Sequence, residues 1–223
     1  MTCDPLIAEK GDYPWKTAVN PILGDLALAY NRGNIVDLGC GTCQLYVYLK
    51  ERGWNGSYIG IDQQRYEGYA YPDGVTLVIA DAFTVDLPPS DTYILYDVLE
   101  HVDDPVRLLS RCLRVARNVL VAVPKRNEDL WRYGIVEYHQ LDRTHKHHGF
   151  SQPELRQLVE RSQGRIVRFQ EIIPTDLSTV LPAFFDSPRL HRWVRRLLRF
   201  WPSKVYYQEF WCEIEPAEDA IGS

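Results

Sequence analysis

A short apolar run that ends at two glycines constrains the fold of this chain most strongly. The stretch NIVDLGCGTCQLYVYLKERG, residues 34–53, passes from an apolar segment through Gly39 and Gly41 into a helical pattern that Gly53 ends. The apolar residues expected on one face of this helix are Leu45, Tyr48 and Leu49. Glycines permit positive φ angles and a close approach of the backbone to a ligand, and the first amides of a helix offer unpaired donors. The stretch therefore predicts a strand, a ligand-binding turn and a helix.

Further apolar segments follow, and helical patterns separate them. Together with the first, the expected strands are 34–38, 57–62, 75–81, 92–98 and 118–124. Nearly continuous apolar residues suit strands that are buried on both faces, as in a parallel sheet. Between the last two, Asp104 as N-cap and Pro105 in the first turn predict the start of a helix, with Val106, Leu109, Leu113 and Ala116 facing inward. Alternating strands and helices predict a doubly wound α/β domain.

The pattern changes after Pro124. Residues 125–150 are polar, aromatic and rich in histidine, which predicts an excursion over the edge of the sheet. Ser151 and Glu154 then form a capping box that begins another helix. The remaining expected segments are strands at 165–173 and 204–216, an insertion at 174–203 and a tail at 217–223. We expect one domain over residues 1–216, with the two excursions on its acceptor side.

Composition limits the classes of protein to which the chain can belong. Its 223 residues, 45% hydrophobic and 25% charged, suit one globular domain, and the net charge of −5 gives no reason to expect nucleic acid as a partner. We expect neither a signal peptide nor a membrane span, because no suitable apolar run is present. The odd number of cysteines, five, suggests reduced thiols in the cytoplasm. Cys40 and Cys43 spell C-x-x-C, but without a second pair they are interpreted as small residues that line the turn.

Acidic residues occur at the ends of three successive expected strands. A dinucleotide-binding turn would carry a third glycine where this chain has Gln44, so a pyrophosphate is a poor match. Asp37, two residues before Gly39, favours a ligand with an ammonium or hydroxyl group. Asp62 ends the second strand, where a carboxylate can accept hydrogen bonds from the vicinal hydroxyls of a ribose. Asp81 ends the third strand, and three such acids beside a glycine turn are hard to explain as solvated side chains alone.

Four motifs in this order resemble those of the class I S-adenosylmethionine-dependent methyltransferases, in particular the small-domain group called type 11. They are VDLGCGT, IGID, ADAF and YDVLEHVDDP, and the similarity extends over residues 33–216. The resemblance implies a Rossmann-like sheet of seven strands, mostly parallel, with the last strand antiparallel. It also implies S-adenosylmethionine as cofactor, with Asp37, Gly39 and Gly41 at the methionine portion, Asp62 at the ribose, and Asp81 with the Ala82 backbone at the adenine. Gln63 and Asp97 complete the expected cofactor-binding residues.

Histidines are the candidate catalytic residues. A sulfonium donor is already activated, so such an enzyme mainly aligns the reactants and excludes water, and it needs a general base only for acceptors that must lose a proton. His101 follows the fourth strand, and the excursion contributes His139, His145, His147 and His148. We expect His101 and His145 to act as bases. The alternative is that these imidazoles only pack the excursion against the sheet.

A metal site is a further interpretation of the same residues. Asp97, Glu100 and His101 have the spacing of a ligand set that His147 or His148 could complete. A related group that methylates the 2′-hydroxyl at RNA 3′ ends carries such a set with metal. Because the segment VLEHV is widespread in metal-free members of the family, we expect no metal and no dependence of activity on one.

The insertion contains a basic amphipathic stretch, RLHRWVRRLLRF. One interpretation is a lid whose arginines are solvated. The other is that residues 189–200 contact an anionic membrane surface or a phosphorylated acceptor. Cytoplasmic localisation is expected, and peripheral contact with the inner face of the membrane follows only from the second interpretation.

The sequence as a whole predicts O- or N-methylation of a small molecule such as a sugar, a lipid-linked glycan or a natural-product scaffold. The first alternative is the metal-assisted RNA-end methyltransferase, which the acidic charge and the lack of a basic-aromatic stripe disfavour. The second is a non-catalytic module that binds S-adenosylmethionine, which the intact acids at three strand ends disfavour.

Overall fold

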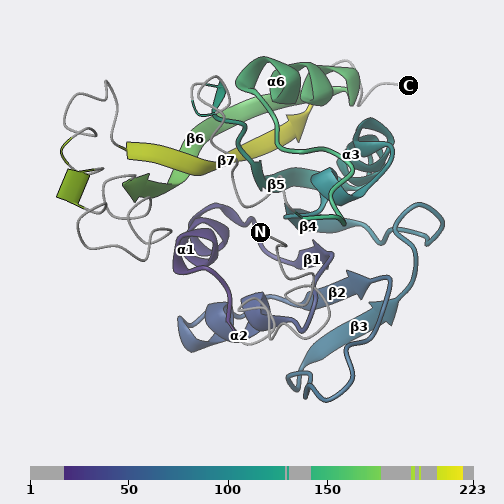
Figure 1. The fold of residues 1–223 in the computed structure, drawn as a ribbon. Coiled ribbons are helices and arrows are strands. Elements are labelled where there is room, and N and C mark those ends of the chain that lie inside the picture. Colours follow the sequence, from purple (N-terminus) through teal and green to yellow (C-terminus); the bar gives the residue numbers. More distant parts are fainter. Residues whose placement is uncertain are drawn as a thin grey trace.

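The protein folds around a single mixed β-sheet (Figure 1). The computed structural model describes residues 18–128, 130, 142–176, 192, 193, 196 and 205–217. The strands in this part of the chain are β1 (Ile35–Leu38), β2 (Tyr58–Asp62), β3 (Val75–Ile79), β4 (Ser90–Tyr96), β5 (Ala116–Pro124), β6 (Gly164–Asp176) and β7 (Val205–Pro216). Their order is β3-β2-β1-β4-β5-β7-β6, and β7 is antiparallel to both of its neighbours while the first five strands are parallel. The predicted seven-stranded fold is therefore confirmed.

Helices cover both faces of the sheet. They are α1 (Pro21–Tyr30), α2 (Gln44–Glu51), η3 (Leu99–His101), α3 (Pro105–Leu113) and α6 (Gln152–Arg161). Helices α1 and α2 lie on one face, and α3 and α6 lie on the other (Figure 1). Side chains along each strand alternate between two apolar cores, so that Val36 and Leu38 face α3 and α6 while Ile35 faces α1 and α2. This arrangement is the predicted doubly wound one.

The predicted caps are present. The side chain of Asp104 accepts a hydrogen bond from the Arg107 amide at 2.9 Å and begins α3. Ser151 and Glu154 form the capping box of α6. Helix α3 ends at Leu113, three residues earlier than the predicted apolar stripe, because Ala116 already belongs to β5.

Helix α1 was not predicted, and it changes the packing of α2. Tyr46, rather than Tyr48, joins Leu45 and Leu49 among the buried residues of α2. Tyr48 is only half-buried because its ring lies against Gly24 of α1, and its hydroxyl donates to Asp25 at 2.6 Å. Tyr48 therefore packs against α1, whereas Leu45 and Leu49 are buried.

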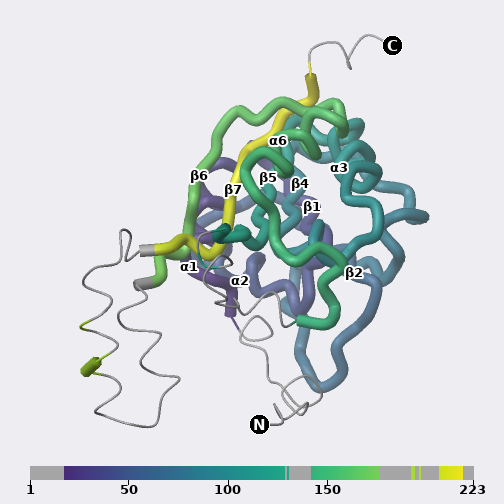
Figure 2. The backbone as a smooth tube through the Cα atoms, turned by 45° about the horizontal axis from the view of Figure 1, so that its top comes forward, coloured from purple at the N-terminus to yellow at the C-terminus, as the bar shows by residue number. Residues whose placement is uncertain are grey.

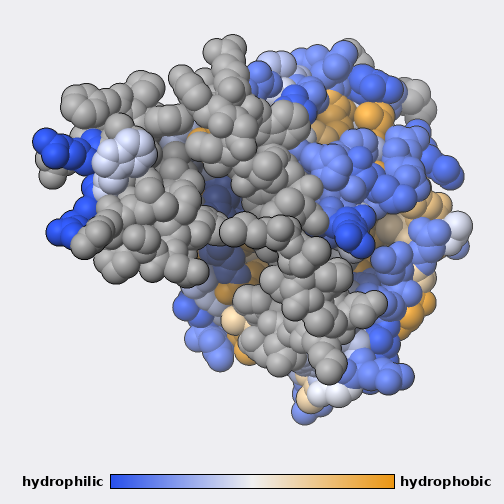
Figure 3. Space-filling model, viewed as in Figure 1, coloured by the Kyte–Doolittle hydropathy of each residue, from blue (hydrophilic) through white to orange (hydrophobic). Residues whose placement is uncertain are grey.

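Strands β6 and β7 run side by side along one flank of the molecule (Figure 2). In the pairing of β5 with β7, Glu209 lies opposite Pro124, the last residue of β5. A residue from the end of the chain is thereby brought to the edge where the parallel strands end. On the face seen in Figure 3, hydrophilic side chains cover most of the described surface, and apolar ones form separate patches. Among the helices of the described residues, none has the length and apolar character needed to cross a membrane.

Candidate functional site

The turn between β1 and α2 brings bare backbone to the C-terminal edge of the parallel strands. Gly39 and Gly41 have φ angles of +78° and +54°, in the left-handed region that favours glycine. The Gly39 amide donates to the Ile61 carbonyl at 2.7 Å, which holds the turn against β2. A Cβ atom on Gly39 would lie 2.6 Å from Cγ2 of Val98, so glycine is required there by both conformation and space. The backbone of this turn therefore has the conformation that the sequence predicts for a loop that a ligand can approach closely.

Asp62 fixes the glycine turn from the end of β2. Its carboxylate is 7% exposed and accepts hydrogen bonds from the Gly41 amide at 2.9 Å and the Gln64 amide at 3.1 Å. Burial raises the pKa of Asp62, and the backbone donors partly oppose that shift. Because each carboxylate oxygen has two lone pairs, further donors such as vicinal hydroxyls can still be accepted. The sequence did not predict that Asp62 also holds the turn.

Asp37 is a buried acid on β1 whose protonation changes near neutral pH. It is 6% exposed, and the Tyr58 hydroxyl donates a hydrogen bond to its Oδ2 atom. Burial raises the pKa of Asp37 to about 7; the Tyr58 hydrogen bond lowers it and the charge of Asp62 raises it further. A cationic ligand group near this carboxylate would favour its charged form.

The other expected cofactor residues lie along the same edge of the sheet. Asp81 and Gln63 are exposed, and Asp81 accepts a hydrogen bond from the Phe83 amide at 2.8 Å. Arg111 donates to the Ala82 carbonyl at 2.6 Å and fixes that backbone. Asp97 follows β4 with a φ of +53°, a rare conformation for a residue other than glycine, and desolvation raises its pKa to about 6.

His101 and His145 are brought together from segments far apart in the sequence. Their ring centroids are 4.5 Å apart and their planes meet at 83°. The amides of Lys146 and His147 donate to the Glu100 carbonyl at 2.7 and 3.0 Å, and these bonds hold the segment 142–150 against η3. The pair predicted from sequence is therefore adjacent.

Hydrogen bonds determine which nitrogen of His101 is available. Its Nδ1 lies 3.3 Å from the Thr144 carbonyl oxygen and 3.1 Å from the Thr144 hydroxyl. That hydroxyl donates its own proton to Asp142 at 2.6 Å, so both Thr144 oxygens act as acceptors for Nδ1–H. In the neutral imidazole Nε2 then keeps its lone pair, which suits either a base or a metal ligand.

The other histidines of the excursion are not part of this pair. His147 has its Nε2 3.1 Å from the Val102 carbonyl oxygen and its ring beside Phe150, and His148 is exposed. His139 lies outside the described residues. The metal-site interpretation therefore needs correction: the imidazole that joins Glu100 and His101 is His145, because the turn at 142–150 directs it toward η3.

A cavity of about 580 Å³ lies elsewhere, between α3, α6 and residues 146–150. Its lining contains none of the acids at the strand ends, and four of its charged side chains form ion pairs with each other. Arg126 contacts Glu154 at 2.6 Å, and Lys146 contacts Asp103 at 3.4 Å. We therefore locate the candidate site at the C-terminal edge of the sheet and not in this cavity.

Comparison with known proteins finds a family match over the part of the chain that contains these strand ends. Residues 36–119 match the family model described as a methyltransferase domain, and these residues include the glycine turn, Asp37, Asp62, Asp81, Asp97 and His101. No curated protein matches the sequence. The resemblance predicted from the motifs is confirmed over residues 36–119, which are similar to the methyltransferase-domain family.

Solved structures share the fold at low sequence identity. The magnesium protoporphyrin IX methyltransferase of Synechocystis PCC 6803 with bound S-adenosylhomocysteine is 17% identical, covering 88% of this chain and 80% of that one, with a TM-score of 0.54. The 1,6-didemethyltoxoflavin-N1-methyltransferase of Burkholderia thailandensis is 15% identical, covering 91% and 80%, with a TM-score of 0.58. The cyclase SpnF is 16% identical, covering 88% and 80%, with a TM-score of 0.55. At these identities the likeness shows the fold alone.

Proposed function

We propose that this protein binds S-adenosylmethionine at the C-terminal edge of its sheet and transfers the methyl group to an oxygen or nitrogen of a small molecule. The observation that carries the proposal is the joint position of Asp37 and Asp62 around a turn that requires glycine at residue 39. A buried acid for an ammonium group, a second acid for a ribose and bare backbone between them fit this cofactor. The match of residues 36–119 to the methyltransferase-domain family supports the same cofactor and reaction.

Each acid has a role that follows from its surroundings. We assign Asp37 to the amino group of the methionine portion, since a nearby cation would stabilise its buried carboxylate. Asp62 is assigned to the ribose hydroxyls, while the Gly39–Gly41 turn provides the backbone that passes along the ligand. Asp81 and the Ala82 backbone are assigned to the adenine. Gln63 and Asp97 flank these groups at the ends of β2 and β4.

The chemistry needs alignment more than activation. The cofactor supplies a methyl group on a sulfonium, which is already a good leaving group. This chain must hold the acceptor in line with that methyl and keep water away. We propose that His101 and His145 contact the acceptor group or a second group that activates the acceptor, because Nε2 of His101 keeps a lone pair.

The acceptor is proposed to be a sugar, a lipid-linked glycan or a natural-product scaffold. The Burkholderia neighbour is an N1-methyltransferase solved with bound 1,6-didemethyltoxoflavin, and it supports a small-molecule acceptor. The test is to incubate the pure protein with methyl-labelled S-adenosylmethionine and extracts of its own host. Label transferred to a small molecule by the wild type and not by Asp62→Ala would support the proposal, and label in RNA would favour the RNA-end alternative.

Cofactor binding gives the first quantitative prediction. Titration calorimetry with S-adenosylhomocysteine should show one site per chain, and Asp62→Ala should weaken binding by about 1–3 kcal/mol because hydrogen bonds to a charged group are lost. The variant loses the ribose contact and also the bond that holds the Gly41 amide. Asp86→Ala, a change of an exposed acid after β3, is the matched control and should bind like the wild type. No heat with wild-type protein at millimolar ligand would contradict the proposed function.

Membrane contact through residues 189–200 gives a second prediction. Of this stretch the structure describes only Arg192, Trp193 and Arg196, which are helical and exposed, with Trp193 at 60% exposure. An exposed tryptophan beside arginines suits an anionic surface, where each arginine can contribute about 1 kcal/mol. Wild-type protein should sediment with vesicles of anionic lipid at low salt and be released as salt rises, because charge attraction is screened beyond about 8–10 Å.

The comparison variant replaces arginines 192, 195, 196 and 199 with glutamine. It should stay in solution yet bind S-adenosylhomocysteine like the wild type. Vesicles without anionic lipid are the second control. Wild-type protein that ignores anionic vesicles at low salt would rule out the membrane contact and leave the lid interpretation.

A further inference from the structure

The side chain of Glu100 is buried without a compensating partner. It is 0% exposed, and neither carboxylate oxygen has a hydrogen-bond partner on another residue of the described part of the chain. A polar group left in this state is costly to a folded protein, and such a group calls for an explanation.

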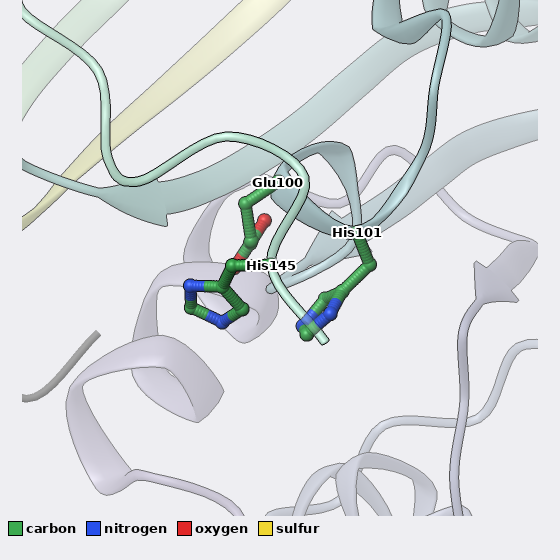
Figure 4. Close-up of side chains that lie close together, drawn as sticks. All are labelled: Glu100, His101 and His145. Carbon is green, nitrogen blue, oxygen red and sulfur yellow. The ribbon is translucent and has the colours of Figure 1, made fainter. Parts of the chain in front are cut away.

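Two imidazoles lie beside this carboxylate (Figure 4). Glu100, His101 and His145 each offer one ligand atom, and these atoms all lie within 4.8 Å of one another. Ligand atoms about 2.1 Å from a common ion lie roughly 3–4 Å apart, so small side-chain rotations would close the set around an ion. Carboxylate and imidazole are both common ligands of divalent transition metals.

Neighbouring groups orient the imidazoles as they do in metal sites. The Nδ1–H of His101 is directed to the oxygens of Thr144, which leaves Nε2 as the ligand nitrogen. Asp142 lies 3.8 Å from Nε2 of His145 and accepts hydrogen bonds from Thr144. A carboxylate or carbonyl behind a ligand histidine is the usual arrangement that fixes the ring and its tautomer.

The local charge also favours a cation. The carboxyl groups of Asp97 and Glu209 interact electrostatically with that of Glu100, so three acids gather in this region. The nearby lysines of the described chain are paired elsewhere, Lys125 with Glu171 at 2.8 Å and Lys146 with Asp103 at 3.4 Å. A divalent ion would supply the missing positive charge and the missing partner of Glu100.

We propose that Glu100, His101 and His145 bind one divalent transition-metal ion. The mixed nitrogen and oxygen set suits Mn²⁺, Fe²⁺, Co²⁺ or Zn²⁺ better than Mg²⁺ or Ca²⁺, which prefer oxygen alone. This differs from the expectation from sequence that no metal is used. We infer binding of the ion from the three side chains alone. Only the role of the ion, to hold and polarise an acceptor oxygen, rests on the proposed function.

The test is metal binding by the full chain after treatment with a chelator. Calorimetric titration with MnCl₂ and absorption spectra with CoCl₂ should show one ion per chain, and the cobalt spectrum should carry the signature of nitrogen ligands. Glu100→Gln and His145→Gln should weaken binding at least about tenfold, the lower end of what changes around metal sites cause. His148→Gln, an exposed imidazole outside the cluster, is the matched control and should bind like the wild type.

Thermal unfolding separates loss of the site from loss of the fold. Without metal, Glu100→Gln should unfold at the wild-type temperature or higher because it replaces a buried ionisable group that has no hydrogen-bond partner, but MnCl₂ should no longer raise that temperature. Absence of stoichiometric binding by wild-type protein, or equal binding by Glu100→Gln, would overturn the metal site. Titration with S-adenosylhomocysteine on the same samples tests the proposed function separately, because that ligand needs Asp37 and Asp62 and not this cluster.

Discussion

Replacing His101 or His145 with glutamine is expected to lower methyl-transfer turnover by about 10²–10⁴-fold, while the affinity for S-adenosylhomocysteine stays nearly unchanged. The two rings lie edge to face with centroids 4.5 Å apart, and His101 ends η3, which follows β4. They contact neither the glycine turn nor Asp62 in any hydrogen bond of the described residues. Their loss should therefore affect the acceptor step and spare the cofactor. The measurement is label transfer to the acceptor found in host extracts, under saturating donor.

Two further variants decide how the imidazoles act. If one of them is a general base, Glu100→Gln should retain most of the turnover and only the base variant should lose the acidic limb of the pH–rate profile. If they are metal ligands, all three variants should lose turnover to a similar extent, because residues that act as a unit are not additive. His148→Gln should behave like the wild type in both cases. Wild-type turnover in both single histidine variants would identify them as packing residues.

Most of the sheet could be predicted from the sequence because buried parallel strands are nearly continuous apolar runs. The strands expected at 34–38, 57–62 and 118–124 agree with β1, β2 and β5 to within two residues at each end. Helix α1 was missed although Asn20 and Pro21 are good start signals, and the Asn20 side chain indeed accepts from the Ile22 amide at 3.0 Å. Its apolar residues pack on α2 as well as on the sheet, so they show no clean single stripe.

The acids of the candidate site could be predicted because their positions follow directly from where the strands end in the sequence. Asp37, Asp62 and Asp81 lie at or just after the ends of parallel strands, and such ends meet at one edge of a sheet. The position of Glu209 was not predictable from the sequence. Glu209 is far from Pro124 along the chain, and only the antiparallel pairing of β7 with β5 brings it to this edge of the sheet. The choice of His145 over its neighbours depends on the turn at Asp142 and Thr144, whose side-chain hydrogen bonds leave no periodic signal in the sequence.

The affinity for S-adenosylhomocysteine is expected to rise about 100-fold between pH 5 and pH 8, the second large effect. Burial raises the pKa of Asp37 to about 7, so at pH 5 only about 1% of the free protein would carry the carboxylate that the ligand ammonium requires. The stability of the fold should change with pH in the opposite direction. Because the pKa of Asp37 in the folded protein lies above its unfolded value near 3.8, Asp37 contributes stability at low pH that is lost as pH rises toward 7. Affinity should increase with pH while the unfolding temperature of the free protein decreases.

Two variants assign this dependence to Asp37. The titratable groups that interact with it are Tyr58 on β2, Tyr96 on β4, Asp62 and Cys40. Tyr58→Phe removes the hydrogen bond that stabilises the carboxylate, so the pKa of Asp37 should rise and the midpoint of the affinity profile should move to higher pH. Asp37→Asn should bind S-adenosylhomocysteine weakly, and its affinity should not change with pH.

The measurement is calorimetry at several pH values, with circular dichroism to verify the fold at pH 5. A wild-type affinity that is constant from pH 5 to pH 8 would show that the ligand ammonium does not meet Asp37, and the methionine portion would then have to bind along the turn through backbone groups alone.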